Sequence, residues 1–187
     1  MRPEAGSLVV KSVERADVSI LALAEEHISR IVVACFDWQE LAQFGPPYWR
    51  PRSSAELRRK IAATAGPQPS TEYSFVVVAD SGELVGECSL HAIDWRNRVA
   101  QVGVCVWHAG DRGHGYGGAA TAHMIDWGFG YLGLRRLEAW IVDGNEPSLA
   151  LFRRLGFAHE GTLRGRYLHA GVSRDMHVLG LMAETPE

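Results

Sequence analysis

The chain has 187 residues, of which 47% are hydrophobic and 22% are charged, and these values are typical of a soluble globular protein. Its net charge of -3 argues against an extended nucleic-acid surface, which requires clustered positive charge. The sequence contains neither an apolar run of about eighteen residues, as a membrane span requires, nor the N-terminal apolar stretch of a signal peptide.

The N-terminal part of the chain predicts helices separated by one loop. Residues 17–36 predict a helix, because Asp17 is a suitable cap and apolar residues recur at helical spacing. The stretch 44–51 contains three prolines and therefore predicts an aromatic-rich loop. Ser53 or Ser54 then caps a second predicted helix that ends near residue 63.

From Tyr73 onward the pattern changes to strands joined by short turns, followed by an alternation of helices and strands. Antiparallel pairing is expected for the first three strands, because their connections are short. The predicted strands are 73–79, 84–94, 99–107, 137–142, 157–160 and 176–181, and the predicted helices are about 118–132 and 148–155.

A glycine-rich turn lies between the third of these strands and the long helix. Five of the nine residues from Gly110 to Gly118 are glycine. Glycine allows positive φ and lets a ligand approach the backbone closely. The free N–H groups of the first helical turn then form a site for phosphate. Because two glycines would suffice for a solvent-exposed turn, we expect a phosphate-bearing ligand here.

Two common phosphate-binding motifs were compared with this turn. A Walker loop is excluded, because no Gly-Lys-Ser/Thr follows. A Rossmann turn is a rival interpretation, since Gly113, Gly115 and Gly118 fit GxGxxG and Glu138 lies on the next strand. That motif normally opens a parallel sheet, whereas three hairpin-linked strands come first here. An NAD(P)-binding protein therefore stays as one alternative function, the least favoured of those considered.

A larger set of segments resembles one family. Arg112-x-x-Gly115-x-Gly117 matches the Q/R-x-x-G-x-G/A signature of the GCN5-related N-acetyltransferases (GNAT), whose loop binds the pyrophosphate of coenzyme A. The resemblance continues through Gly82–Gly86, Ile93-Asp94, Asn97-Arg98, Leu132–Leu137, Asn145-x-x-Ser148, Leu155–Phe157, Glu160–Arg164 and Asp175. The combination resembles the RimJ/RimL-type branch, which acetylates protein N-termini, polyamines and other small amines.

The resemblance implies an α/β (α+β) fold with a mixed, strongly bent sheet. Its central parallel strands, here 99–107 and 137–142, would splay apart to admit the pantetheine arm of acetyl-CoA. It also implies a single GNAT domain over 1–187. The N-terminal helices and the acceptor-side loop would occupy 1–70, and the acyl-CoA-binding sheet and helices would occupy 71–187.

By the same resemblance, the cofactor would be held mostly by backbone groups. Val104 and Val106 would pair with pantetheine, Asn145 would contact it, and Ser148 would lie near the sulfur. Arg112, Arg153 and Arg154 are candidate cations for the 3′-phosphate. The pyrophosphate would be held by the backbone N–H groups of His114, Gly115, Gly117 and Gly118. The remaining cofactor-binding residues of the turn would be Arg112, Gly113 and Tyr116.

Direct acyl transfer requires a neutral amine, a polarised carbonyl and a proton for the departing thiolate. Period-two alternation along 84–94 places Glu87, Ser89 and His91 on one face, together with Val85 and Ile93. Glu87 is the candidate base and His91 the alternative, although either position also suits an ordinary polar residue on a sheet face.

By the resemblance, Ser148 is the candidate proton donor to the thiolate or its hydrogen-bond partner. The sequence departs from the family pattern at Phe152, where many relatives carry a tyrosine as general acid. The acceptor's own pKa sets how strong a base is needed. Neutralising a lysine-like amine at pH 7 costs roughly 4–5 kcal/mol, whereas an α-amine near pKa 8 costs about 1–1.4 kcal/mol.

The acceptor is expected to be a small-molecule amine or a peptide or protein N-terminus. A homodimer is compatible with the sequence. Three scattered cysteines without a CxxC pair indicate a cytoplasmic protein, and the eight histidines show no metal-ligand spacing, so no metal is expected. Two further alternatives stay open: another acyl-CoA as donor, and a non-catalytic coenzyme A-binding module, which the missing tyrosine motivates.

Overall fold

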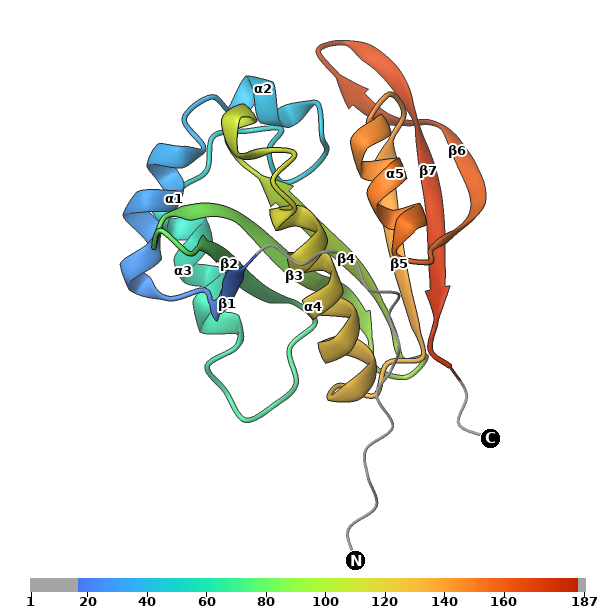
Figure 1. Cartoon of the computed structure of the whole chain (residues 1–187), viewed down its shortest axis with the longest axis horizontal. Coiled ribbons are helices and arrows are strands. Elements are labelled where there is room, and N and C mark those ends of the chain that lie inside the picture. The colour runs from blue at the N-terminus through green and yellow to red at the C-terminus, as the bar shows by residue number, and fades with distance from the viewer. Residues whose placement is uncertain (1–16, 185–187) are drawn as a thin grey trace, which may run out of the picture.

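The computed structural model describes residues 17–184, which form a seven-stranded mixed sheet with helices on both faces (Figure 1). The strand order is β1-β2-β3-β4-β5-β7-β6, and all neighbours are antiparallel except β4 and β5. The strands are β1 (Val18–Ala22), β2 (Tyr73–Ala79), β3 (Leu84–Asp94), β4 (Val99–Val106), β5 (Arg136–Val142), β6 (Ala158–His169) and β7 (Val172–Met182).

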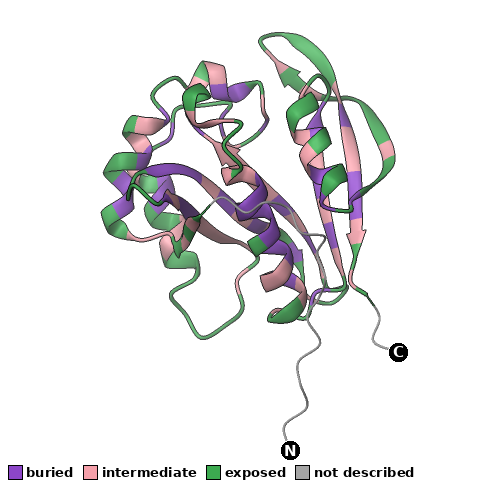
Figure 2. Ribbon diagram, in the orientation of Figure 1, coloured by how far each residue is buried: buried purple, intermediate pink, exposed green. Residues whose placement is uncertain are grey.

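Two hydrophobic cores lie on opposite faces of this sheet. Val77 of β2 belongs to the core under α4 and α5, whereas its neighbour Val76 belongs to the core under α1 and α3. The buried residues accordingly follow the strands and the inner sides of these helices (Figure 2). The helices are α1 (Ile28–Ala34), α2 (Trp38–Ala42), α3 (Ser54–Ala63), α4 (Tyr116–Gly130) and α5 (Glu146–Arg154), with 3₁₀ turns η1 (Glu25–His27) and η2 (Ala109–Asp111).

The parallel strands β4 and β5 pair at one end only. Their register runs from Val99↔Arg136 to Gln101↔Glu138 and stops there. Beyond this point β4 stays paired with β3, and β5 stays paired with β7 along its whole length. The two strands therefore splay apart, as the predicted fold requires, and leave a gap in the middle of the sheet.

The N-terminal prediction was wrong in its first part. Residues 17–36 do not form one helix, because Val18–Ala22 is an edge strand that pairs with β2. Val18 and Ile20 alternate inward against the core, a pattern that a helix period also fits over so few residues. The second predicted helix is confirmed: Ser53 caps α3 through the Glu56 amide, and the 44–51 segment is a loop.

The C-terminal strands are longer than predicted. Strands were expected at 157–160 and 176–181, but β6 and β7 form one hairpin over Ala158–Met182. The intervening residues are mostly polar and exposed, so they lack the apolar signal of a half-buried strand.

The alternation along β3 holds only in the middle of the strand. Glu87 and His91 share a face, but Val85 and Ile93 join the opposite core with Leu90. A bulge between β2 and β3 shifts the register beside Val85, and a second irregularity follows His91 at Ala92, which has φ +50°. Each bulge reverses the sidedness of the residues beyond it, so placing Val85 and Ile93 with Glu87 was wrong.

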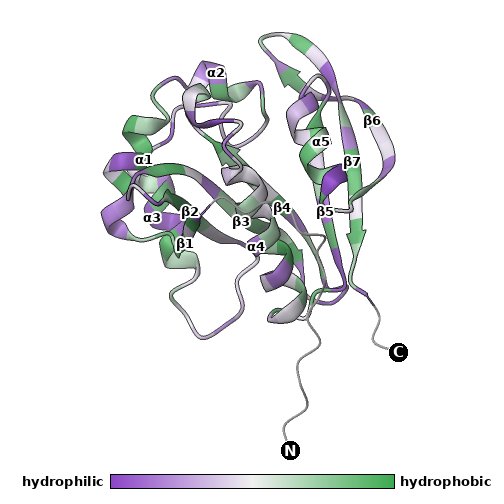
Figure 3. Cartoon of the chain, viewed as in Figure 1, coloured by the Kyte–Doolittle hydropathy of each residue, from purple (hydrophilic) through white to green (hydrophobic). Residues whose placement is uncertain are grey.

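Hydrophobic residues are concentrated in the central strands and in α4 (Figure 3). Among residues 17–184, no helix has both the length and the apolar character needed to cross a bilayer.

Gly86 allows β3 and β4 to approach closely, because a Cβ at this position would lie 2.3 Å from the Cys105 carbonyl oxygen. We expect Gly86→Ala to lower the free energy of unfolding by about 1–3 kcal/mol through overpacking. Urea unfolding measures this loss. Gly66→Ala is the control, since nothing lies within 4 Å of its added Cβ; equal midpoints for the two variants would contradict the assignment.

Candidate active site

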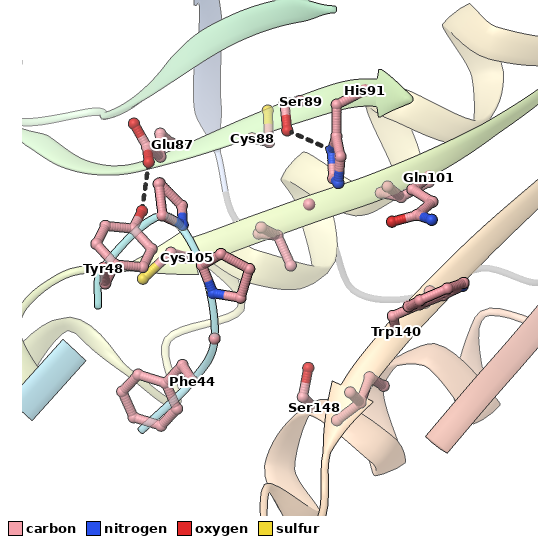
Figure 4. A pocket seen from close by; sticks show the side chains of 18 of the residues that line it. Phe44, Tyr48, Glu87, Cys88, Ser89, His91, Gln101, Cys105, Trp140 and Ser148 are labelled. Carbon is pink, nitrogen blue, oxygen red and sulfur yellow. Dashed lines mark hydrogen bonds between the residues drawn. The ribbon is translucent and has the colours of Figure 1, made fainter. Parts of the chain in front are cut away.

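A cleft of about 860 Å³ passes through the gap between β4 and β5. Its wall on one side is β3 and β4, and on the other it is β5 with the start of α5 (Figure 4). The 44–48 loop and the β6–β7 hairpin close its remaining sides. Beyond Gln101 the inner edge of β4 has no strand partner among residues 17–184, so its backbone groups face this cleft.

One end of the cleft lies at the N-terminus of α4. Gly115 is the N-cap in left-handed conformation (φ +84°) and offers no side-chain oxygen to the helix. The amides of Tyr116, Gly117 and Gly118 therefore have no acceptor in the described part of the chain. Gly117 lines the cleft, whereas His114 and Gly118 do not. This end can hold an anion through backbone N–H groups.

The Arg112 side chain connects the glycine-rich turn to α2 and to the end of β4. Its guanidinium donates to both carboxylate oxygens of Glu40, at 2.7 and 3.0 Å, and to the carbonyls of Val106 and Trp107. It also lies over the Phe44 ring at 4.7 Å from the centroid. A phosphate at Arg112 would have to compete with these contacts. The other two candidate cations, Arg153 and Arg154, are exposed in the last turn of α5 and do not line the cleft.

Glu87 lies in the cleft wall, held by two side chains from the N-terminal part of the chain. Its Oε1 accepts from Arg52 at 2.6 Å and from the Tyr48 hydroxyl. The Arg52 side chain is fully buried and also lies 3.3 Å from Glu56. Burial by itself raises the pKa of Glu87. The charge of Arg52 and these hydrogen bonds lower it by a larger amount, so the pKa of Glu87 falls below its usual value.

His91 lies on the same face of β3 as Glu87, four residues further along the strand. Its Nδ1 lies 3.2 Å from the Ser89 hydroxyl, and both residues line the cleft (Figure 4). Burial is the main reason that the pKa of His91 is lowered, so the ring is neutral near pH 7. Gly103 on β4 makes room for this pair, because a Cβ there would lie 2.8 Å from the Ser89 hydroxyl.

The start of α5 brings Asn145 and Ser148 to the opposite wall. The Asn145 side-chain oxygen caps the helix by accepting from the Ser148 amide at 3.3 Å. The Asn145 amide nitrogen and the Ser148 hydroxyl have no partner among residues 17–184, and both residues line the cleft. Phe152 is 3% exposed and packs edge to face against Phe157. Its ring carries no hydroxyl, so it cannot act as a general acid.

Cys105 is a thiol in the cleft wall beside Glu87. Burial and the neighbouring carboxylate raise the pKa of this thiol to about 12. It is therefore protonated near neutral pH and is a poor nucleophile. In the described part of the chain, no group of three or more His, Cys, Asp or Glu residues is arranged to hold a metal ion.

The structure thus brings most of the sequence-predicted site residues to one cleft: Glu87, His91, Val104, Val106, Arg112, Gly117, Asn145 and Ser148. Three further lining residues, Gln101, Trp140 and Arg166, were not anticipated, nor was Arg52 behind the wall. Trp140 could have been found from the strand alternation of 137–142, but nothing in the sequence pairs Arg52 with Glu87 across 35 residues.

Comparison with known proteins matches this fold to one family. The family model described as acetyltransferase (GNAT) domain matches residues 18–158. The chain is 32% identical over 107 residues to the "Uncharacterized N-acetyltransferase p20" of Bacillus licheniformis, covering 57% of this chain and 60% of that protein. It is 35% identical over 102 residues to the "Putative ribosomal N-acetyltransferase YdaF" of Bacillus subtilis, covering 54% and 55%. The matches thus span less than two thirds of these curated relatives.

Solved structures share the architecture over most of the chain. A crystal structure of a "Probable acetyltransferase" superposes with a TM-score of 0.77 at 26% identity, covering 88% of this chain and 92% of that one. The spermidine N-acetyltransferase of Vibrio cholerae in complex with CoA and spermine superposes with a TM-score of 0.76, covering 88% and 95%. Its identity is 18%, so this second likeness concerns the fold alone.

The Arg52–Glu87 pair is expected to dominate the stability of the cleft wall. Arg52→Met leaves a buried carboxylate without its cation, which should lower the free energy of unfolding by about 3–5 kcal/mol. Arg58→Met is the control, since Arg58 lies on the same stretch of chain and forms an exposed pair with Glu25. Urea unfolding should show little change in that control.

The pH dependence of the Arg52→Met variant distinguishes this account from simple loss of packing. In the native protein the lowered pKa of Glu87 contributes stability that is complete above its usual value of 4.5 and is lost as the pH falls. In the variant, burial raises the pKa of Glu87 instead, so stability should decrease as the pH rises from about 4 to 8. Parallel pH profiles for both proteins would contradict the pairing.

Proposed function

The chain belongs to the GNAT acetyltransferase family, and from this premise we propose that it transfers an acetyl group from acetyl-CoA to a primary amine by direct attack in a ternary complex. The main support is the cleft through the splayed strands, which joins partnerless α4 amides to a polar face of β3. The same geometry argues against NAD(P) binding, because the glycine turn follows a strand of a mostly antiparallel sheet.

We assign acetyl-CoA to the β4–β5 side of the cleft. The amides of the turn and of the first turn of α4 would bind the pyrophosphate, with Gly117 closest to the gap. The inner edge of β4 from Val104 to Val106 and the free amide group of Asn145 would bind pantetheine. Arg153 and Arg154 stay the candidates for the 3′-phosphate, because Arg112 is already bonded to Glu40.

The amine is assigned to the β3 side. Glu87 is ionised and fixed by Arg52 and Tyr48, so it is suited to bind the ammonium form of the acceptor, but its low pKa makes it a weak base. His91, neutral near pH 7, is better matched to receive the proton, directly or through water. Such modest basicity fits an α-amine near pKa 8 better than a lysine-like amine.

Two other groups complete the proposed reaction. The Ser148 hydroxyl, on the wall opposite β3, would hydrogen-bond or protonate the departing thiolate (Figure 4). Cys105 stays protonated, which favours direct transfer over an acyl-cysteine intermediate. An α-amine acceptor, including a peptide N-terminus, agrees with the RimJ/RimL-type resemblance and with the name of the Bacillus subtilis relative.

Release of free thiol from acetyl-CoA in the presence of α-amines, polyamines and peptide N-termini tests this proposal. Turnover above the hydrolysis rate supports catalysis, whereas tight acetyl-CoA binding without turnover on any amine would favour a non-catalytic coenzyme A-binding module. The observation that favours this second function is Phe152, which is buried and lacks the hydroxyl of the tyrosine that many relatives carry there.

Gly117→Val should weaken acetyl-CoA binding without unfolding the protein. A Cβ at Gly117 lies 3.7 Å or more from Leu151, Val104 and Val106, so it meets ordinary contacts but projects into the gap. We expect acetyl-CoA affinity to fall about tenfold or more, measured by calorimetry. Gly130→Val on the same helix has open space around its Cβ and is the control. Unchanged affinity in Gly117→Val would contradict the placement of the cofactor.

Ser148→Ala should slow the chemical step rather than binding. We expect kcat to fall about tenfold, less than a typical general acid effect, because a thiol of pKa about 8.5 leaves readily as thiolate. Acetyl-CoA affinity should stay constant, and Ser148→Thr, which keeps a hydroxyl, should restore most of kcat. Equal kcat values for the Ala and Thr variants would remove Ser148 from the mechanism.

A further inference from the structure

The acceptor end of the cleft carries three carboxylates, and each already has a cation beside it. Glu87 is bonded to Arg52, and Glu72 accepts from Lys60 at 2.5 Å. Glu56 lies 3.3 Å from the same Arg52 and 4.0 Å from Arg50, so three cations neutralise the three carboxylates. Among residues 17–184 that line the cleft, no acidic side chain is therefore left without a basic neighbour.

The basic residues that line the same cleft are in excess. Arg59 on α3 and Arg166 on β6 both line the cleft, and neither has a carboxylate partner in the described part of the chain. Arg166 lies over the Trp140 ring, at 5.8 Å from its centroid, and the indole N–H of Trp140 is itself directed to Glu138. Both arginines are exposed and free to contact a ligand.

The face of β2, β3 and β4 that lines this cleft also offers polar, uncharged residues. Ser74, Ser89 and Gly103 are register partners across β2, β3 and β4, and all three line the cleft. The unneutralised charge of the cleft lining is therefore positive. Such a site repels the additional ammonium groups of a polyamine and attracts an anion.

Building on the proposed acetyl transfer, we propose that the acceptor is an amine that also carries an anionic group, a carboxylate or a phosphate, which Arg59 and Arg166 recognise. The ammonium group would approach Glu87, and the anionic group would lie toward the two arginines. Recognition by the arginines would act mainly on KM, because neither of them is placed at the reacting atoms.

Peptide amides that share an N-terminal alanine test this inference, because the reacting α-amine stays the same. The acceptors are Ala-Glu-amide against Ala-Gln-amide and Ala-Lys-amide, Ala-phosphoserine-amide against Ala-Ser-amide, and spermidine. We expect kcat/KM to be about tenfold higher for the acidic member than for its neutral partner, through KM. The preference should shrink as salt is raised to about 0.5 M, and comparing the two acidic peptides distinguishes carboxylate from phosphate.

Paired variants locate the preference. The double variant Arg59→Gln, Arg166→Gln should abolish it and leave kcat on Ala-Gln-amide unchanged. The matched control is Arg58→Gln, Arg164→Gln, which removes two exposed arginines from the same elements that do not line the cleft; it should retain the preference.

Faster turnover of spermidine or Ala-Lys-amide than of the acidic peptides, or a preference that survives the Arg59, Arg166 double variant, would overturn the inference while acetyl transfer itself stands. Acetyl-CoA binding with no turnover of any acceptor would instead overturn the proposed function, and this inference with it.

Discussion

The short contact between β4 and β5 is the constraint on which the rest of this structure depends. Pairing over three residue pairs fixes the two halves of the sheet, and its loss beyond Gln101 leaves a row of backbone donors and acceptors that need water or a ligand. Each strand keeps its full outer partner, so the gap does not dissolve the sheet. The cleft, the partnerless amides of α4 and the polar face of β3 all meet at this opening.

The second organising interaction is the buried ion pair behind the β3 wall. Arg52 brings the N-terminal part of the chain into contact with Glu87 and Glu56, so residues far apart in sequence jointly set the charge of the acceptor side. A buried pair of this kind costs desolvation energy and is weak evidence of stabilisation by itself. Its effect on function is clearer: it keeps Glu87 ionised and fixed in one orientation, while His91 stays neutral on the same strand.

The sequence predicted the middle of the fold well because local signals there agree. Strands β2 and β3 begin and end where predicted, and the glycine turn correctly marked the start of α4. Prediction from the sequence failed where the structure depends on contacts between distant residues. Edge strand β1 has too few residues to separate a strand period from a helical one, and the bulges beside Val85 and Ala92 depend on strand pairing. The Arg52–Glu87 contact likewise has no sequence signature.

Contacts across the opening join the two halves of the sheet at the other end. The Tyr167 hydroxyl of β6 donates to the Ala42 carbonyl of α2 at 2.7 Å, far from the paired ends of β4 and β5. The hydrophobic core also crosses this boundary, since buried residues of β4, α4, β5 and α5 belong to one cluster. The two walls are therefore held together on both sides of the opening, and a ligand enters a preformed slot that does not have to be assembled first.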